Sequence, residues 1–168
     1  MHLDITWTCP CCGQKFFRLP LAYAFSEPDV WRAAPPEQRS RGVIGSDSCS
    51  FDGRHFIRGR IVIPVADTSD FVWGTWAEVS KESFARFGSL WDAKIREHEP
   101  PMPGILANDI QLYPTTLGLT CSIRMQNDGR RPHFTIEAQD HPLAQEQRSG
   151  ITLERVTEIA SKVYDHRK

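Results

Sequence analysis

Three cysteines close together near the start of the chain are the residues whose type and spacing most directly indicate chemistry. The segment Cys9-Pro10-Cys11-Cys12-Gly13 has the C-P-x-C-G pattern of a zinc knuckle. In such a knuckle two thiolates separated by two residues form half of a tetrahedral zinc site, and the glycine allows the tight turn. The pattern therefore predicts a structural zinc ion held by Cys9 and Cys12.

The other half of such a site has no motif of its own, because the chain contains no second C-x-x-C and no H-x-x-x-H. Cys49 is the first choice for a third ligand. A hairpin that turns at Asp52-Gly53 would place Cys49 beside Phe56, on the face away from the main aliphatic layer. The weaker candidates are Cys11, His55 and His141. Cys121 lies in an alternating apolar run, which is typical of a small core residue.

Two other interpretations of the cysteine motif stay open. C-P-x-C also occurs in thioredoxin-like redox pairs, which follow a buried strand and open a helix. The residues after Gly13, from Gln14 to Arg18, have the pattern of a returning strand instead. The third interpretation is a set of reduced thiols without a ligand. Bound zinc is the favoured reading of the three.

A polar run towards the end of the chain contains the second group of candidate functional residues. A histidine between acids can act as a base or as a metal ligand, so the alternative to a binding protein is a small hydrolase-type or metal-dependent enzyme. Its weak catalytic candidates are His141, Asp140, Glu137 and Glu146. No nucleophile or oxyanion device lies nearby in sequence, so the favoured interpretation is structural. Asp140 would then form a turn, and His141 would bond a backbone group.

Hydrophobic periodicity predicts the elements that must position these residues. Strands are predicted at residues 3–8 and 14–19, either side of the knuckle, and a third, Phe71–Val79, follows the Asp52-Gly53 hairpin. Ser80 and Thr152 are predicted N-caps of helices over 81–97 and 152–165. Gly59 is expected to mark a β-bulge.

The most specific structural prediction concerns a hairpin that turns at Asp128-Gly129. Alternating apolar residues on both sides of this turn share the same parity only if Ile123 faces Phe134. The same register places Cys121 opposite Ile136.

The order of these elements predicts an α+β fold, with a mostly antiparallel sheet built from hairpins, helices packed on one side, and a knuckle-like hairpin at the amino terminus. We expect residues 1–168 to form a single domain. Its predicted parts are the knuckle-like hairpin over 1–20, a sheet over 46–138 with the inserted helix 81–97, and the final helix 152–165.

Composition limits the classes of function. Twenty basic and twenty-one acidic residues give a formal net charge of −1, which argues against a nucleic-acid partner. No apolar run approaches the roughly 20 residues of a membrane span, and no signal peptide is visible at the start. The odd number of five cysteines does not indicate a disulfide framework. We therefore expect a cytoplasmic protein without membrane association, and a protein partner stays open.

Taken together, the segments resemble an uncharacterised bacterial family, domain of unknown function 2199. The resemblance runs over nearly the whole chain, and it implies no activity, substrate or catalytic residue. Members of that family often carry a histidine a few residues after the knuckle glycine, whereas this chain has Phe16 near that point. The segments that carry the resemblance are Cys9-x-x-Cys12-Gly13, Asp47-x-Cys49, His55-Phe56-Ile57-Arg58-Gly59, Ile63-Pro64-Val65, Trp73-Gly74-x-Trp76, Phe84 to Trp91, Tyr113-Pro114-x-Thr116, Arg131-Pro132, and Asp140-His141-Pro142-Leu143-Ala144-x-Glu146-Gln147 through Gly150-Ile151-Thr152.

Because a structural zinc explains the strongest motif and no complete catalytic set is legible, the sequence favours a non-catalytic interaction or binding module over an enzyme.

Overall fold

The computed structural model describes residues 1–164 and has the α+β class that the sequence predicts. Its centre is a closed barrel, in which each of five strands pairs with the next and the last pairs with the first. The strands of the barrel are β8 (Arg54–Ile63), β9 (Phe71–Val79), β10 (Met102–Leu106), β11 (Thr120–Arg124) and β12 (His133–Ile136).

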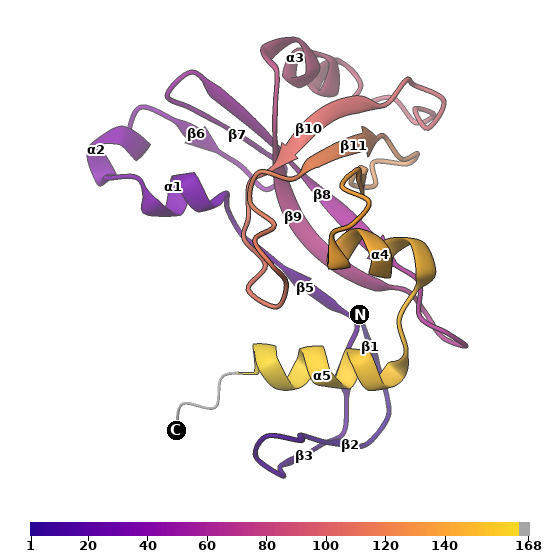
Figure 1. The fold of residues 1–168 in the computed structure, drawn as a ribbon. Helices are drawn as coiled ribbons and strands as arrows, with labels where there is room; N and C mark the ends of the chain where they lie inside the picture. The colour runs from indigo at the N-terminus through magenta and orange to yellow at the C-terminus, as the bar shows by residue number, and fades with distance from the viewer. Residues whose placement is uncertain (165–168) are drawn as a thin grey trace.

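The barrel closes where β12 runs parallel to β8, with His133 paired to Arg60. The other four pairs of neighbouring strands in the barrel are antiparallel. A ring of five strands that run alternately up and down must contain one parallel pair, because the number is odd. The predicted α+β class is therefore confirmed, whereas the predicted sheet with helices on one side is instead a closed barrel. A closed sheet has an inside and an outside, and the helices lie around it at several positions (Figure 1).

Shorter strands lie outside the barrel. Two small antiparallel pairs come from the amino terminus, one strand runs parallel to β9, and two more extend the sheet beyond β8. The strands of the pairs are β1 (His2–Leu3) with β4 (Leu19–Pro20) and β2 (Trp7–Thr8) with β3 (Lys15–Phe16); the others are β5 (Ala22–Ala24), β6 (Val43–Ile44) and β7 (Ser48–Phe51).

The helices are α1 (Asp29–Ala33), α2 (Pro36–Arg39), α3 (Lys81–Ser89), α4 (Pro142–Ser149) and α5 (Leu153–Val163). Ser80 and Thr152 cap α3 and α5 as predicted, each accepting a hydrogen bond from the backbone N–H three residues on. The predicted helix 81–97 is wrong in length, since α3 ends at Ser89. The predicted last residue of the final helix, 165, lies outside the described residues. No described helix is both long and apolar enough to cross a membrane.

The early end of α3 has a physical cause in Arg96, which is only 1% exposed. Its guanidinium donates hydrogen bonds to the carbonyl oxygens of Leu90, Trp91, Gln126 and Arg130 at 2.6 to 3.1 Å. This arrangement needs the chain after α3 to fold around the side chain, and a continuing helix would keep its own carbonyls occupied.

The predicted strand registers are confirmed. Ile123 pairs with Phe134 and Cys121 with Ile136, and in the other hairpin Cys49 pairs with Phe56. The expected β-bulge at Gly59 is wrong, because β8 pairs with β9 without interruption from His55 to Ile63.

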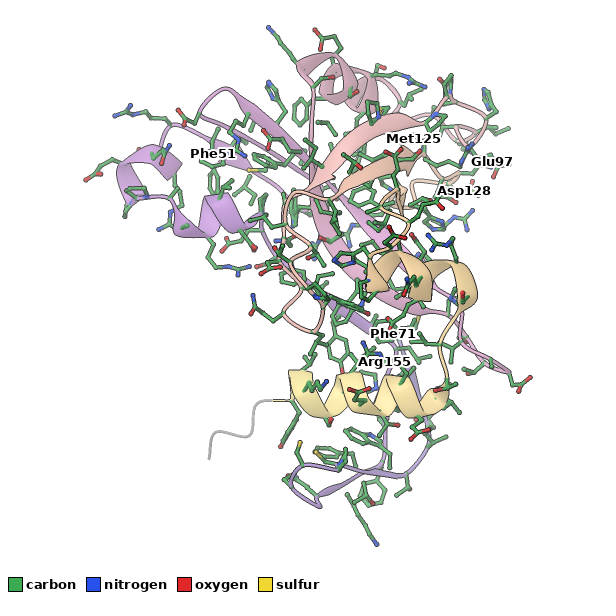
Figure 2. All side chains as sticks on the ribbon, viewed as in Figure 1. Phe51, Phe71, Glu97, Met125, Asp128 and Arg155 are labelled. Carbon is green, nitrogen blue, oxygen red and sulfur yellow. The ribbon has the colours of Figure 1, made fainter. Side chains whose placement is uncertain are left out.

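Buried apolar residues form two clusters, one within and below the barrel and one outside it. Phe71 and Met125 belong to the first cluster, whereas Phe51 belongs to the second, between β7 and α1, well apart from them (Figure 2). Cys121 is in the first cluster and Cys49 is in the second. The thiols of Cys49 and Cys121 therefore lie in different packing environments, and neither is part of the amino-terminal hairpin.

Candidate functional site

The cysteine motif forms the turn of the β2–β3 hairpin, as the zinc-knuckle pattern requires. Trp7 pairs with Phe16 across the two strands. The turn is closed by hydrogen bonds from the Cys9 N–H to the Gln14 carbonyl and from the Gly13 N–H to the Cys9 carbonyl, both 2.8 Å. Gly13 has a φ of +71°, a conformation that favours glycine. The backbone is thus folded tightly around the sulfur atoms.

Three thiols meet at this turn. The sulfurs of Cys9 and Cys11 are 3.2 Å apart, and the Cys11 sulfur lies 3.6 Å from the carbonyl oxygen of Ser161 on α5. Cys9 is 1% exposed, while Cys11 and Cys12 are exposed. The turn therefore presents two accessible thiols and shields a third.

The environment makes Cys9 the most acidic of the thiols whose pKa is shifted. Burial alone raises the pKa of Cys9, but hydrogen bonds from the Cys11 thiol and from the backbone N–H groups of Cys11 and Cys12 outweigh it and lower the pKa to about 7. The same hydrogen bond, together with burial and the charge of Cys9, raises the pKa of Cys11. A thiolate is both the metal-binding and the nucleophilic form of cysteine. Cys9 is therefore the sulfur that is prepared for either chemistry.

The structure does not bring the remaining predicted metal ligands, Cys49, His55 and His141, to this turn. Cys49, on β7, is buried beside Phe56 of β8. Burial and the charge of Glu27 raise the pKa of Cys49 to about 11. His55 lies on β8, with Nδ1 3.1 Å from the Ser50 hydroxyl. Within residues 1–164, no group of three or more His, Cys, Asp or Glu side chains is arranged to hold a metal ion. Among the described residues, the cysteine turn is accordingly a half-site.

His141 bonds backbone groups, as its structural interpretation predicts, and it is the N-cap of α4. Its Nδ1 accepts a hydrogen bond from the backbone N–H of Leu143 at 3.2 Å. Its Nε2 lies 3.0 Å from the Pro114 carbonyl and 3.2 Å from the Thr115 carbonyl. Carbonyl oxygens only accept, so Nε2 carries the hydrogen and both ring nitrogens are engaged with backbone.

The acids proposed to work with His141 have other surroundings. Glu146 accepts hydrogen bonds from the Tyr113 hydroxyl at 2.6 Å and from Arg155 Nε at 2.7 Å. Glu137 lines a cavity over β10 and β11, and Asp140 is exposed. Burial and the bond to Glu146 raise the pKa of Tyr113 above its ordinary value. This network joins α4 to α5, and its residues lie too far apart in sequence for a local motif to indicate it.

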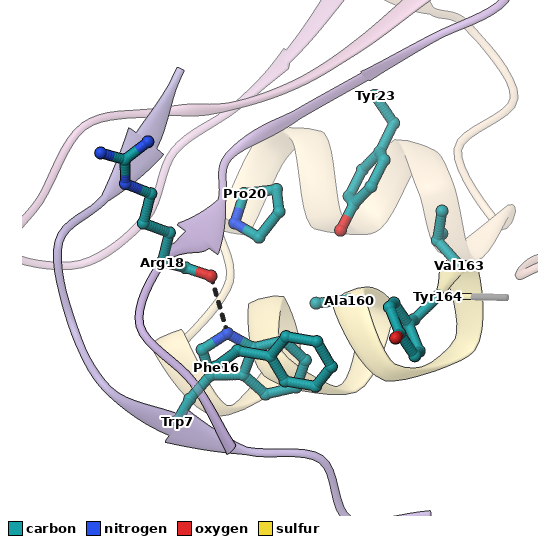
Figure 3. A pocket seen from close by; sticks show the side chains of 8 residues that line it. All are labelled: Trp7, Phe16, Arg18, Pro20, Tyr23, Ala160, Val163 and Tyr164. Atoms are coloured by element: carbon teal, nitrogen blue, oxygen red, sulfur yellow. Dashed lines mark hydrogen bonds between the residues drawn. The ribbon is translucent and has the colours of Figure 1, made fainter. Parts of the chain in front are cut away.

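A cavity of about 360 Å³ lies between the hairpin and α5 (Figure 3). Trp7 and Phe16 stack at 4.8 Å with their planes 18° apart, and Phe16 meets the edge of Tyr164 at 4.8 Å. Phe16 is therefore a packing residue in this hairpin. The walls consist of Trp7, Phe16, Arg18, Pro20, Tyr23, Ala160, Val163 and Tyr164.

Local sequence patterns did not predict this cavity. The available signal was the pair of aromatic residues at matching positions before and after the cysteine turn, which a hairpin brings together. The wall supplied by α5 comes from the other end of the chain and has no local signal.

Comparison with known proteins confirms the predicted family resemblance. The model of a family described as an uncharacterized protein conserved in bacteria, DUF2199, matches residues 8–151. No curated protein and no solved structure matches the chain.

Proposed function

Because the chain belongs to this uncharacterised bacterial family, we propose from its own geometry that it is a non-catalytic binding module whose amino-terminal hairpin carries a structural zinc knuckle. The observation that carries this proposal is the environment of Cys9. Backbone N–H groups of Cys11 and Cys12 both donate to its sulfur, and its pKa is lowered to about 7. Donors of this kind stabilise the negative charge of a metal-bound thiolate.

Cys9 and Cys12 are the proposed ligands, and Cys11 is the nearest third thiol. Zinc bound there would supply a structural link in the turn and no redox chemistry. The turn adjoins α5 through the contact between Cys11 and Ser161. A turn stabilised by zinc would therefore hold Trp7 and Phe16, which line the aromatic cavity, in place against α5.

The surroundings of His141 support binding over catalysis. A catalytic histidine needs one ring nitrogen that can exchange a proton with a substrate. Here one nitrogen accepts from Leu143 and the other donates to the carbonyls of residues 114 and 115. Glu146 is likewise held by Tyr113 and Arg155. These contacts stabilise the positions of α4 and α5. The aromatic cavity is the proposed binding surface.

Metal analysis of the full chain, purified without chelator, tests the metal half of the proposal. We expect about one zinc per chain, and we expect chelation to lower the melting temperature by roughly 5–10 °C because structural zinc contributes to folding. Cys12→Ser should lose the metal. Cys49→Ala removes a cysteine from a different cluster and should keep it. Protein without stoichiometric metal whose melting temperature ignores chelators would contradict the proposal.

Tryptophan fluorescence tests the link between the knuckle and the cavity. Trp7 is 8% exposed and donates a hydrogen bond to the Arg18 carbonyl at 2.9 Å. Removing the metal should loosen the hairpin and expose this ring, so that emission shifts to longer wavelength. The shift should disappear in Trp7→Phe. A shift that persists in that variant would show that metal loss acts elsewhere in the protein.

A further inference from the structure

The contact between the sulfurs of Cys9 and Cys11 suggests a chemistry that a zinc knuckle does not use. A knuckle needs Cys9 and Cys12, but the Cys9 sulfur also contacts the sulfur of Cys11, at 3.2 Å. All three cysteines belong to one turn at the end of the molecule that is formed by β2 and β3 (Figure 1). Two thiols at this separation are within a small movement of the roughly 2.05 Å S–S bond length.

We propose that Cys9 and Cys11 form a reversible disulfide with a low-molecular-weight disulfide as the oxidant, and that this oxidised turn cannot hold a metal. The disulfide shares Cys9 with the zinc half-site, so the proposed loss of metal binding on oxidation rests on the proposed function. The disulfide itself requires no metal.

The exposure of the two residues sets the order of the steps. Cys11 is exposed, so it is the thiol that the oxidant reaches first. It loses its proton to solvent, attacks one sulfur of the oxidant, breaks that S–S bond and releases one small thiolate. The product is a mixed disulfide on Cys11. The Cys9 thiolate, which is shielded from solvent but adjacent, then attacks the Cys11 sulfur and displaces the second small thiolate.

The reaction balances without another reagent. The two protein thiols lose two electrons and two protons, the oxidant takes up both, and one protein disulfide and two small thiols result. An excess of small thiol reverses both steps. Bond formation draws the Cys11 sulfur towards Cys9 and away from Ser161, which weakens a contact between the hairpin and α5.

The remaining cysteines provide an internal comparison. Cys49 and Cys121 are each 1% exposed and lie in different clusters of buried residues, so a small disulfide does not reach either thiol. They should stay reduced under conditions that oxidise the turn. Selective oxidation would therefore reflect the arrangement of the turn and not the general reactivity of cysteine in this protein.

Equilibration of the metal-free full chain in reduced and oxidised glutathione, followed by acid quench, alkylation and mass spectrometry, tests the proposal. We expect one intramolecular disulfide that dithiothreitol reverses, with Cys49 and Cys121 alkylated after unfolding. Cys12→Ser should still form it. Cys11→Ser should not, and should stop at a glutathione adduct or remain reduced.

Three results would overturn the inference: no disulfide at any ratio, a disulfide that survives in Cys11→Ser, or oxidation of Cys49 or Cys121 at the same ratio as the turn. Zinc content is measured separately on the reduced protein. A chain that binds no zinc but forms the Cys9–Cys11 disulfide contradicts the proposed knuckle and supports this inference. If the reduced and the oxidised protein bind zinc equally, the proposed loss of metal binding on oxidation is wrong.

Discussion

The ring of Phe134 on β12 lies directly against the backbone of Gly59 on β8. A Cβ atom at position 59 would be only 2.2 Å from Cε1 of that ring. Gly59 and Phe134 are the chain neighbours of Arg60 and His133, the pair through which the barrel closes. Glycine is therefore required here by a close approach of two strands, and not by a bulge or an unusual backbone angle.

Substitution of Gly59 by alanine should weaken this closure. We expect Gly59→Ala to lower the free energy of unfolding by about 1–3 kcal/mol, because the phenyl ring must move to admit a methyl group. Urea denaturation measures the loss. Gly88→Ala is the matched control, since position 88 has open space and lies in α3. The control should be unchanged or up to about 1 kcal/mol more stable. Equal stability of Gly59→Ala and the unmodified protein would contradict the interpretation.

The buried guanidinium of Arg96 should be essential to the loop after α3. We expect Arg96→Met to lower the free energy of unfolding by about 3 kcal/mol, because carbonyl oxygens are left without a hydrogen bond. Arg124→Met, at an exposed position on β11, should change stability by less than about 0.5 kcal/mol. Both are measured by urea denaturation. Similar values for the two variants would mean that water satisfies the carbonyls in place of Arg96.

The ion pair between Asp47 and Arg131 should make part of the stability depend on pH. Burial raises the pKa of Asp47, but the hydrogen bonds from Arg131 and Ser46 and the charges of Arg131 and Arg58 outweigh it and lower the pKa. A lowered folded pKa means that the contribution is complete above the unfolded value of about 3.9 and is lost as pH falls through the folded value.

Urea midpoints measured from pH 7 to pH 3 test this dependence. Asp47→Asn should be less stable than the unmodified protein at pH 7, by less than about 1 kcal/mol because the pair is partly exposed. The difference should shrink below about pH 4. Asp92→Asn, which alters an exposed carboxylate, should leave the profile unchanged. A difference for Asp47→Asn that is constant across the range would exclude the ion pair as its cause.

The two-sided engagement of His141 predicts a loss of stability when the ring is removed. His141→Ala should lower the free energy of unfolding by about 1–2 kcal/mol, through loss of the α4 cap and of the bond to the carbonyls of residues 114 and 115. His141→Asn should recover part of the loss, because asparagine is a good N-cap. Exposed His98→Ala is the control. Thermal and urea unfolding measure all three, and an unaffected His141→Ala would leave the ring available for another role.

Local sequence patterns predicted the hairpins well. The pairing of Ile123 with Phe134 follows from the parity of two alternating runs around a two-residue turn, and a slip of one residue would reverse every side chain. The hairpin that contains Cys49 follows from the same logic. The cysteine turn was predicted as a hairpin from its knuckle pattern and from the strand-like segments on either side, although its function was not thereby established.

Long-range relationships account for what was missed. The parallel contact of β12 with β8 leaves no local pattern, so an open sheet was expected in place of a barrel. The predicted helix 81–97 was too long, because two of the carbonyls that bind Arg96 come from the distant loop between β11 and β12. By contrast, α4 could have been predicted, since Pro142 stands at its first turn and Gly150 follows its last residue with a φ of +77°.

The parallel closure of the barrel also has a consequence for the order of folding. The hairpins β8–β9 and β11–β12 join neighbouring segments, so little chain entropy is lost when they form. Closing the ring joins β8 to β12 across most of the barrel sequence, and the entropy of that large loop must be lost before the contact stabilises anything. We therefore expect ring closure after the rate-limiting step, so that Gly59→Ala accelerates unfolding more than it slows folding.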